Sequence, residues 1–189
     1  IEDTAILDRQ EMYIPKIERC DFWLGSKNTL AYMASLENLV KLDWPIIAMI
    51  RNPVDTLASW RNTFSHLAEA KVSNFPVAHP NLIAWSTQQR EALLEIDGQP
   101  EAAMRRVLLW RLLARTLLAQ ESKIHLWRYE DLINSPVELL QGFNKQLNFQ
   151  DAIAVPQAKI KKRDQNYDAT EHQMLFDLCF EELKYFKYL

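Results

Sequence analysis

The fold is decided by residues 46–59, which read Ile46-Ile47-Ala48-Met49-Ile50-Arg51-Asn52-Pro53-Val54-Asp55-Thr56-Leu57-Ala58-Ser59. Its first five residues form an uninterrupted apolar run that is too short for a buried helix. Such a run is typical of a strand buried on both faces in a parallel sheet. Asn52 is a favoured N-cap and Pro53 a favoured first helical residue, so a helix is predicted from Pro53 to about His66.

The alternation of strand and helix continues on both sides of this stretch. Short apolar runs predict further strands over residues 21–25 and 123–127. Caps and helical spacing of apolar residues predict helices over residues 29–42, 81–96, 100–120, 135–147 and from 170 onwards. The chain is therefore expected to be an α/β protein, a single domain of residues 1–189 with a mainly parallel sheet and helices on both faces.

The composition is that of an ordinary globular domain. The chain has 189 residues, of which 48% are hydrophobic and 25% charged, and its formal net charge is −3. A slightly acidic chain argues against a nucleic-acid binder that relies on a strongly basic surface. No apolar run reaches the roughly 18 residues that a membrane-spanning helix needs, so no membrane span is predicted in this segment.

The two cysteines, Cys20 and Cys179, have neither a metal-ligand spacing nor the pattern of a disulfide framework. No metal site is therefore predicted, and a reducing compartment, the cytoplasm, is favoured. The chain begins at Ile1 rather than at a methionine. A longer protein with an N-terminal anchor would leave the Golgi lumen open as an alternative.

Arg51 is the strongest candidate for a binding residue. It follows a predicted buried strand, at the edge where open α/β sheets bind ligands. It also precedes a helix N-terminus, where backbone N–H groups and the helix dipole favour an anion. A guanidinium there can hold phosphate through two parallel hydrogen bonds. Ser59, eight residues later, can add a hydroxyl donor, and Thr56 lies one turn before it on the same helix.

The segment from Arg51 to Ser59 resembles the 3′-phosphate-binding motif of sulfotransferases that use 3′-phosphoadenosine 5′-phosphosulfate. That motif is a strand followed by Arg, Asp or Asn, Pro, any residue and Asp, with a Ser eight residues after the Arg. The resemblance implies a P-loop NTPase-like sulfotransferase fold in which Arg51 and Ser59 bind the 3′-phosphate of the donor. It also implies a nucleotide co-substrate and no metal.

A second segment, residues 126–136, reads Leu-Trp-Arg-Tyr-Glu-Asp-Leu-Ile-Asn-Ser-Pro and again follows a predicted strand. It resembles the Arg-Tyr-Glu-Asp-Leu…Pro segment of bacterial and Golgi-type sulfotransferases. By this similarity Tyr129 lies near the adenine, where an aromatic ring can stack; a core tyrosine with a satisfied hydroxyl is an equal alternative. Glu130 and Asp131 are expected to order the turn and the next helix start.

Other matches to this family are weaker. Lys27 follows the first predicted strand, as a lysine does in the family, so it is a candidate for neutralising the sulfuryl group, with a solvated lysine as the alternative. The basic run 159–163 is favoured as a solvated surface over a phosphate-binding loop. No family motif marks a catalytic histidine among His66, His79, His125 and His172.

One family feature is missing. The family's N-terminal phosphate loop has the form Pro-x-Ser-Gly-Thr, and this sequence contains nothing like it. A Walker loop or dinucleotide fingerprint is excluded too, because both need clustered glycines and the three present are far apart: Gly25, Gly98 and Gly142. The resemblance therefore runs from about Trp23 to the C-terminus.

The predicted function is sulfuryl transfer from the donor to a hydroxyl or amine of a small molecule or glycan. Two alternatives remain from the residues alone. One is another P-loop-type transferase, such as a small-molecule kinase, with its Walker loop outside this sequence. The other is a non-catalytic module in which Trp85 and Trp110 either pack in the core or form an interface.

Overall fold

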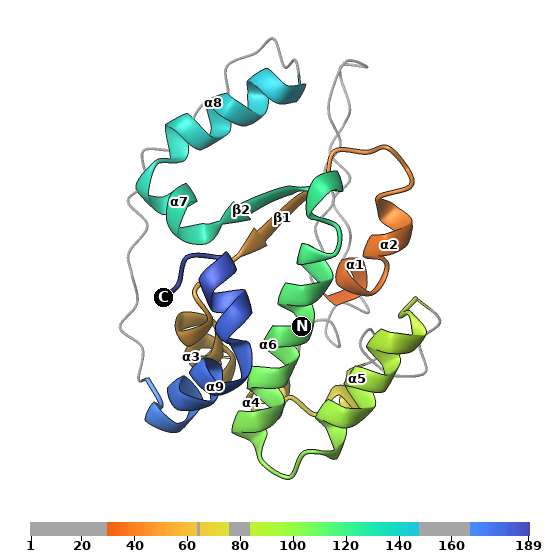
Figure 1. Cartoon of the computed structure of the whole chain (residues 1–189), viewed down its shortest axis with the longest axis vertical. Coiled ribbons are helices and arrows are strands. Elements are labelled where there is room, and N and C mark those ends of the chain that lie inside the picture. The colour runs from red at the N-terminus through yellow and green to blue at the C-terminus, as the bar shows by residue number, and fades with distance from the viewer. Residues whose placement is uncertain (1–29, 64, 76–83, 148–166) are drawn as a thin grey trace, which may run out of the picture.

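Figure 1 shows a computed structural model of the chain, which describes residues 30–63, 65–75, 84–147 and 167–189. These residues are mostly helical and surround a small parallel sheet. The elements are α1 (Leu30–Ala34), α2 (Leu36–Leu39), β1 (Ile47–Ile50), α3 (Pro53–Thr63), α4 (Ser65–Glu69), the 3₁₀ turn η3 (Val72–Asn74), α5 (Thr87–Gly98), α6 (Ala102–Leu118), the 3₁₀ turn η4 (Glu121–Lys123), β2 (His125–Arg128), α7 (Tyr129–Asn134), α8 (Pro136–Leu147) and α9 (Ala169–Tyr185).

The described sheet has two parallel strands. Ile47 of β1 lies opposite His125 of β2, and Ile50 lies opposite Arg128. The chain between the strands runs through helices, as a parallel pair requires. This arrangement agrees with the predicted α/β class, whereas the strand predicted over residues 21–25 lies outside the described residues.

Helices lie on both faces of the sheet. On one face Ala48, Ile50 and Leu126 belong to a hydrophobic core shared with α6 and α9. On the other face, Phe143 of α8 meets the ring of His125 edge-on, with the centroids 5.3 Å apart. Figure 1 shows α8 on one side of the sheet and α6 with α9 on the other.

The prediction that the strand 46–50 is buried on both faces was wrong. Ile47 and Met49 are each 44% exposed, whereas Ile50 is buried. Their cross-strand partners are His125 and Trp127, so all four side chains share the face of α8. Phe143 packs against the β2 half of that face. A run of apolar residues indicates a strand but does not reveal how far a helix extends over it.

Helix α6 joins two hydrophobic clusters. Val107 and Trp110 lie in the cluster under the sheet, whereas Leu109 lies in a second cluster with Trp85 of the segment before α5. Both tryptophans are buried, which confirms core packing as their role in the fold. Helix α6 is therefore buried on more than one side. None of the described helices, of which α6 and α9 have 17 residues each, is long and apolar enough to cross a membrane.

Several helix boundaries differ from those predicted. Helix α5 begins at Thr87, because Ser86 and Gln89 form a capping box: Gln89 N–H donates to Ser86 Oγ, and Ser86 N–H donates to Gln89 Oε1. The predicted helix 53–66 is divided into α3 and α4, and that over residues 29–42 into α1 and α2. In contrast, α8 spans Pro136–Leu147 as predicted.

Buried ion pairs fasten α9 to its neighbours. Glu171 accepts hydrogen bonds from Arg106 of α6, at 2.6 Å, and from Arg61 of α3. Further along α9, Glu182 pairs with Arg115 of α6. Burial by itself raises the pKa of Glu182, but the hydrogen bond and charge of Arg115 leave this pKa lowered. These pairs hold the chain's last helix, and the residues after it, in place beside the sheet.

Candidate functional site

Two turns meet at the carboxyl edge of the sheet. Because β1 and β2 are parallel and Ile50 lies opposite Arg128, the residues that follow the two strands emerge side by side. Arg51 follows β1 and Tyr129 follows β2, and the guanidinium carbon of Arg51 lies 5.2 Å from the centroid of the Tyr129 ring. This is the range of a cation–π contact. The structure thus brings together two of the predicted site residues.

The N-terminus of α3 lies beside this pair and is capped as predicted. Asn52 Oδ1 accepts a hydrogen bond from Val54 N–H at 2.9 Å, and its carbonyl accepts from Thr56 N–H at 2.9 Å. Pro53 occupies the first helical position and is buried. The positive end of the α3 dipole therefore lies next to Arg51.

Glu130 locks the two turns to each other. Its Oε1 accepts a hydrogen bond at 2.9 Å from the backbone N–H of Asn52, which is 78 positions away in the sequence. Its Oε2 accepts from the hydroxyl of Tyr188, beyond the end of α9, also at 2.9 Å. This agrees with the expectation that Glu130 orders the turn. Both carboxylate oxygens are engaged in holding the backbone around the site.

Arg51 has hydrogen-bonding capacity that the described residues leave unused. Its Nε is buried and has no hydrogen-bond partner in the described part of the chain. The nearest carboxylate oxygen, Asp55 Oδ2, lies 3.8 Å from Nη2, which is longer than a hydrogen bond. The side chain is 31% exposed. A buried donor without a partner is costly, and an anion at this edge would draw on the exposed part of the same guanidinium.

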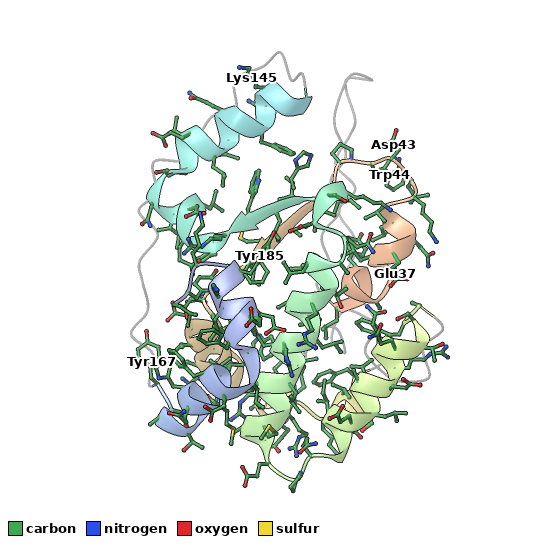
Figure 2. The ribbon with its side chains drawn as sticks, viewed as in Figure 1. Glu37, Asp43, Trp44, Lys145, Tyr167 and Tyr185 are labelled. Atoms are coloured by element: carbon green, nitrogen blue, oxygen red, sulfur yellow. The ribbon has the colours of Figure 1, made fainter. Side chains whose placement is uncertain are left out.

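A cavity of about 520 Å³ opens beside the start of α3. Asn52 and Asp55 line it on one side, and Tyr167, Asp168 and His172 line it from the start of α9. The hydroxyl of Tyr167 donates to Asp55 Oδ1 at 2.9 Å, and Figure 2 shows Tyr167 just before α9. Tyr167 and Asp168 belong to no motif that marks a site in the sequence. Asp55 carried a readable signal, since it lies four positions after Arg51, in the first turn of α3.

Ser59 is in α3, partly buried, and no described contact joins it to Arg51 or Tyr129. The Thr56 hydroxyl donates to the carbonyl of Asn52 at 2.9 Å, so it serves the helix itself. Lys27 and the basic run 159–163 lie outside the described residues. The structure therefore brings Arg51 and Tyr129 together, and the binding roles of Arg51, Ser59, Tyr129 and Lys27 stay predictions.

The three described histidines, His66, His125 and His172, lie on different elements, α4, β2 and α9. His125 packs against Phe143, and the ring of His66 meets that of Phe75 edge-on, with the centroids 5.3 Å apart. His172 is exposed at the cavity beside α3, and His79 lies outside the described residues. Within the described ranges, no group of three or more His, Cys, Asp or Glu residues could hold a metal ion.

Tyr188 stands on the far side of Glu130 from Asn52. The guanidinium carbon of Arg128, the last residue of β2, lies 4.9 Å from the centroid of the Tyr188 ring. Burial, together with the hydrogen bond to Glu130, raises the pKa of the Tyr188 hydroxyl well above its ordinary value. Arg51 over Tyr129 and Arg128 over Tyr188 thus form two stacked pairs on either side of the Glu130 bridge.

The raised pKa of Tyr188 predicts a loss of stability in alkali. A tyrosine whose pKa is higher in the folded chain than its ordinary value of 10.0 stabilises the fold fully below pH 10. That stabilisation is lost as the pH rises through the pKa of Tyr188 in the folded chain, because the unfolded chain releases the same proton at a lower pH. Tyr188→Phe removes both the hydrogen bond and the titration. The variant is expected to be about 1–2 kcal/mol less stable than the wild type at pH 8.

Urea unfolding at pH 8, 10 and 11 measures this effect. The difference between wild type and Tyr188→Phe should narrow as the pH rises. Tyr129→Phe is the matched control and should keep the alkaline decline of the wild type, because Tyr188 remains. Parallel curves for wild type and Tyr188→Phe would show that Tyr188 does not carry the effect.

Comparison of the chain with protein-family models, with curated proteins and with solved structures gives no match. The fold and the residues at the sheet edge are therefore the ground for assigning a function.

Proposed function

We propose that this chain is the nucleotide-binding part of a sulfotransferase that uses 3′-phosphoadenosine 5′-phosphosulfate. The observation that carries the proposal is the position of Arg51. It lies at the carboxyl end of β1, beside the capped start of α3, with its ring contact to Tyr129 and its buried Nε without a described partner. We place the chain in the P-loop NTPase-like sulfotransferase fold, which the parallel strands and their helical crossover support.

The chemistry of this edge suits a phosphate. The dipole of α3 and the guanidinium of Arg51 add their positive potential at one point. Arginine can grip a phosphate with two parallel hydrogen bonds, which a lysine cannot do. Under this proposal Arg51 and Ser59 hold the 3′-phosphate, and the Tyr129 ring, which already stacks on Arg51, lies against the adenine.

The reaction proposed is an in-line transfer. The acceptor oxygen or nitrogen forms a bond to sulfur as the bond from sulfur to the bridging oxygen of the 5′-phosphate breaks. Adenosine 3′,5′-bisphosphate leaves, and the acceptor's proton passes to a base. The chain's part is to position the nucleotide and stabilise its charge, with Lys27 proposed to neutralise the sulfuryl group. Because the sequence lacks the Pro-x-Ser-Gly-Thr loop, the proposed site is the 3′-phosphate and adenine part of the donor site.

Asp55 tunes the affinity of this site. Its carboxylate lies 3.8 Å from Arg51 and also accepts from Tyr167, so it stands where it opposes a phosphate. Removing its charge while keeping its shape is expected to strengthen phosphate binding. Asp55→Asn and Arg51→Ala therefore change the binding of one ligand in opposite directions.

The test is a thermal-shift titration of the whole chain with adenosine 3′,5′-bisphosphate and with 5′-AMP. Binding to the folded state raises Tm, so the bisphosphate should stabilise the wild type more than 5′-AMP does. Arg51→Ala should weaken bisphosphate binding by roughly tenfold or more, the value of a charged hydrogen-bonding partner. Asp55→Asn should bind the bisphosphate several-fold more tightly.

Arg90→Ala is the matched control, because Arg90 lies on α5 and its described hydrogen bond is a local one to Thr87. It should leave both titrations unchanged. Equal shifts with the bisphosphate and 5′-AMP, or a full bisphosphate shift in Arg51→Ala, would refute the assignment of a 3′-phosphate site to Arg51.

A further inference from the structure

A second, larger cavity lies on the other side of the Glu130 bridge. Its volume is about 670 Å³, and it opens between β2, η4 and the residues at the end of α9. Aromatic and aliphatic side chains make up much of its wall, among them Leu126, Trp127, Tyr185 and Phe186. Figure 2 shows Tyr185 at the end of α9 nearest the sheet. These surfaces can pack against the flat apolar body of a small molecule.

Lys187 brings a positive charge to this cavity from a strained backbone position. Helix α9 ends in a Schellman motif, in which Tyr188 N–H donates to the carbonyl of Leu183 at 2.9 Å and Lys187 N–H donates to that of Lys184 at 3.1 Å. The motif needs a left-handed residue after the helix, usually glycine, and here Lys187 takes it with φ 59°. A lysine at this costly position lines the cavity.

Arg128 brings a second positive charge. One face of its guanidinium is covered by the Tyr188 ring, and its Nε is buried without a hydrogen-bond partner among the described residues. Its contact with Asp131 is 3.9 Å long, beyond hydrogen-bonding distance. The side chain is 28% exposed and lines the cavity, so its outer edge can still donate to a ligand.

Two acidic residues also line this cavity, Glu121 and Asp131, and Asp131 lies 3.9 Å from Arg128. Glu121 accepts a hydrogen bond from the hydroxyl of Tyr185, which fixes it at the η4 side. Asp131 is 53% exposed on α7 and therefore largely hydrated. Arg128 and Lys187 are the positively charged residues that line the cavity.

We infer that this cavity binds a small aromatic anion, with its ring against the exposed Tyr185 and its acidic group between Arg128 and Lys187. The anionic group can be a sulfonate, sulfate, phosphate or carboxylate, since each accepts the same hydrogen bonds from a guanidinium. None of Arg51, Ser59 and Tyr129 lines this cavity. The inference therefore goes beyond the proposed donor site and does not depend on it.

Calorimetric titration of the whole chain with naphthalene-2-sulfonate tests the site, with the uncharged naphthalene-2-methanol as comparison. The sulfonate is expected to bind the wild type roughly tenfold or more tightly than the alcohol. Arg128→Gln should weaken sulfonate binding roughly tenfold and leave alcohol binding unchanged. Lys187→Gly should also weaken sulfonate binding, while raising the stability of the fold because glycine suits the left-handed position.

Lys145→Gln removes one positive charge from α8, at the end of the molecule where Figure 2 labels it, and should leave sulfonate binding unchanged. Lys187→Gly keeps the inference testable even if Arg128→Gln fails to fold. Equal affinity for the sulfonate and the alcohol, or sulfonate binding that survives both substitutions, would overturn the inference. Loss of bisphosphate binding in Arg51→Ala with sulfonate binding retained would separate this site from the proposed donor site.

Discussion

Replacing Glu171 by glutamine is expected to lower the free energy of unfolding by about 3–5 kcal/mol, because it leaves buried arginine charge without its partner. Glu171 is only 3% exposed, and it accepts hydrogen bonds from Arg106 and Arg61. Arg106 is itself 6% exposed, so water cannot replace the lost carboxylate. The amide keeps the size of the side chain and removes only its charge.

The loss is measured by urea unfolding and by Tm. For a chain of this size, each kcal/mol corresponds to roughly 2–4 °C in Tm. Glu181→Gln is the matched control, since Glu181 lies on the same helix, α9, and is exposed. Its stability should stay within about 0.5 kcal/mol of the wild type. A Glu171→Gln protein as stable as this control would show that the buried pairs do not hold α9.

Replacing Trp85 by alanine is the second large effect, expected to cost about 3–5 kcal/mol. Trp85 is 1% exposed and packs in the cluster formed by α1, α4, α5 and α6, where its removal leaves a cavity that the neighbours cannot fill. Trp85→Phe should be milder, because the ring is largely retained. The indole N–H of Trp85, which has no hydrogen-bond partner in the described part of the chain, is lost in that variant too.

Trp44 provides a control with the same chemistry at the surface. It is 68% exposed beside β1, and Figure 2 labels it near α2. Trp44→Ala should change the unfolding free energy by less than about 0.5 kcal/mol. Similar losses for Trp85→Ala and Trp44→Ala in urea unfolding would contradict the burial of Trp85.

Loss of Glu171 should disturb the candidate site more than loss of Trp85 does. Glu171 anchors α9, whose end carries Tyr188 to its hydrogen bond with Glu130, and Glu130 in turn holds the backbone of Asn52. Trp85 lies in the other cluster, which shares no buried residue with the core under the sheet. We therefore expect Glu171→Gln to weaken bisphosphate binding more than a Trp85 substitution that costs the same free energy of unfolding.

Local patterns in the sequence were sufficient to predict the strand, turn and helix around Arg51. The apolar run, the Asn52 cap and Pro53 predicted a strand, a turn and a helix, and β1 and α3 have this form. Capping and apolar spacing act over a few positions, so they can be read without knowing the rest of the chain. The capping box of Ser86 and Gln89 was equally readable and would have placed the start of α5.

The meeting of distant segments was decided by packing alone. The contact of Arg51 with Tyr129 depends on the register of β1 against β2, and the bridge from Glu130 to Asn52 joins residues 78 positions apart. The exposure of Ile47 and Met49 depends on how far α8 reaches over the sheet, and the cation at Lys187 depends on how α9 ends. Periodicity specifies which face of an element is apolar. Which side chains then meet across elements follows from the register and packing of the whole chain.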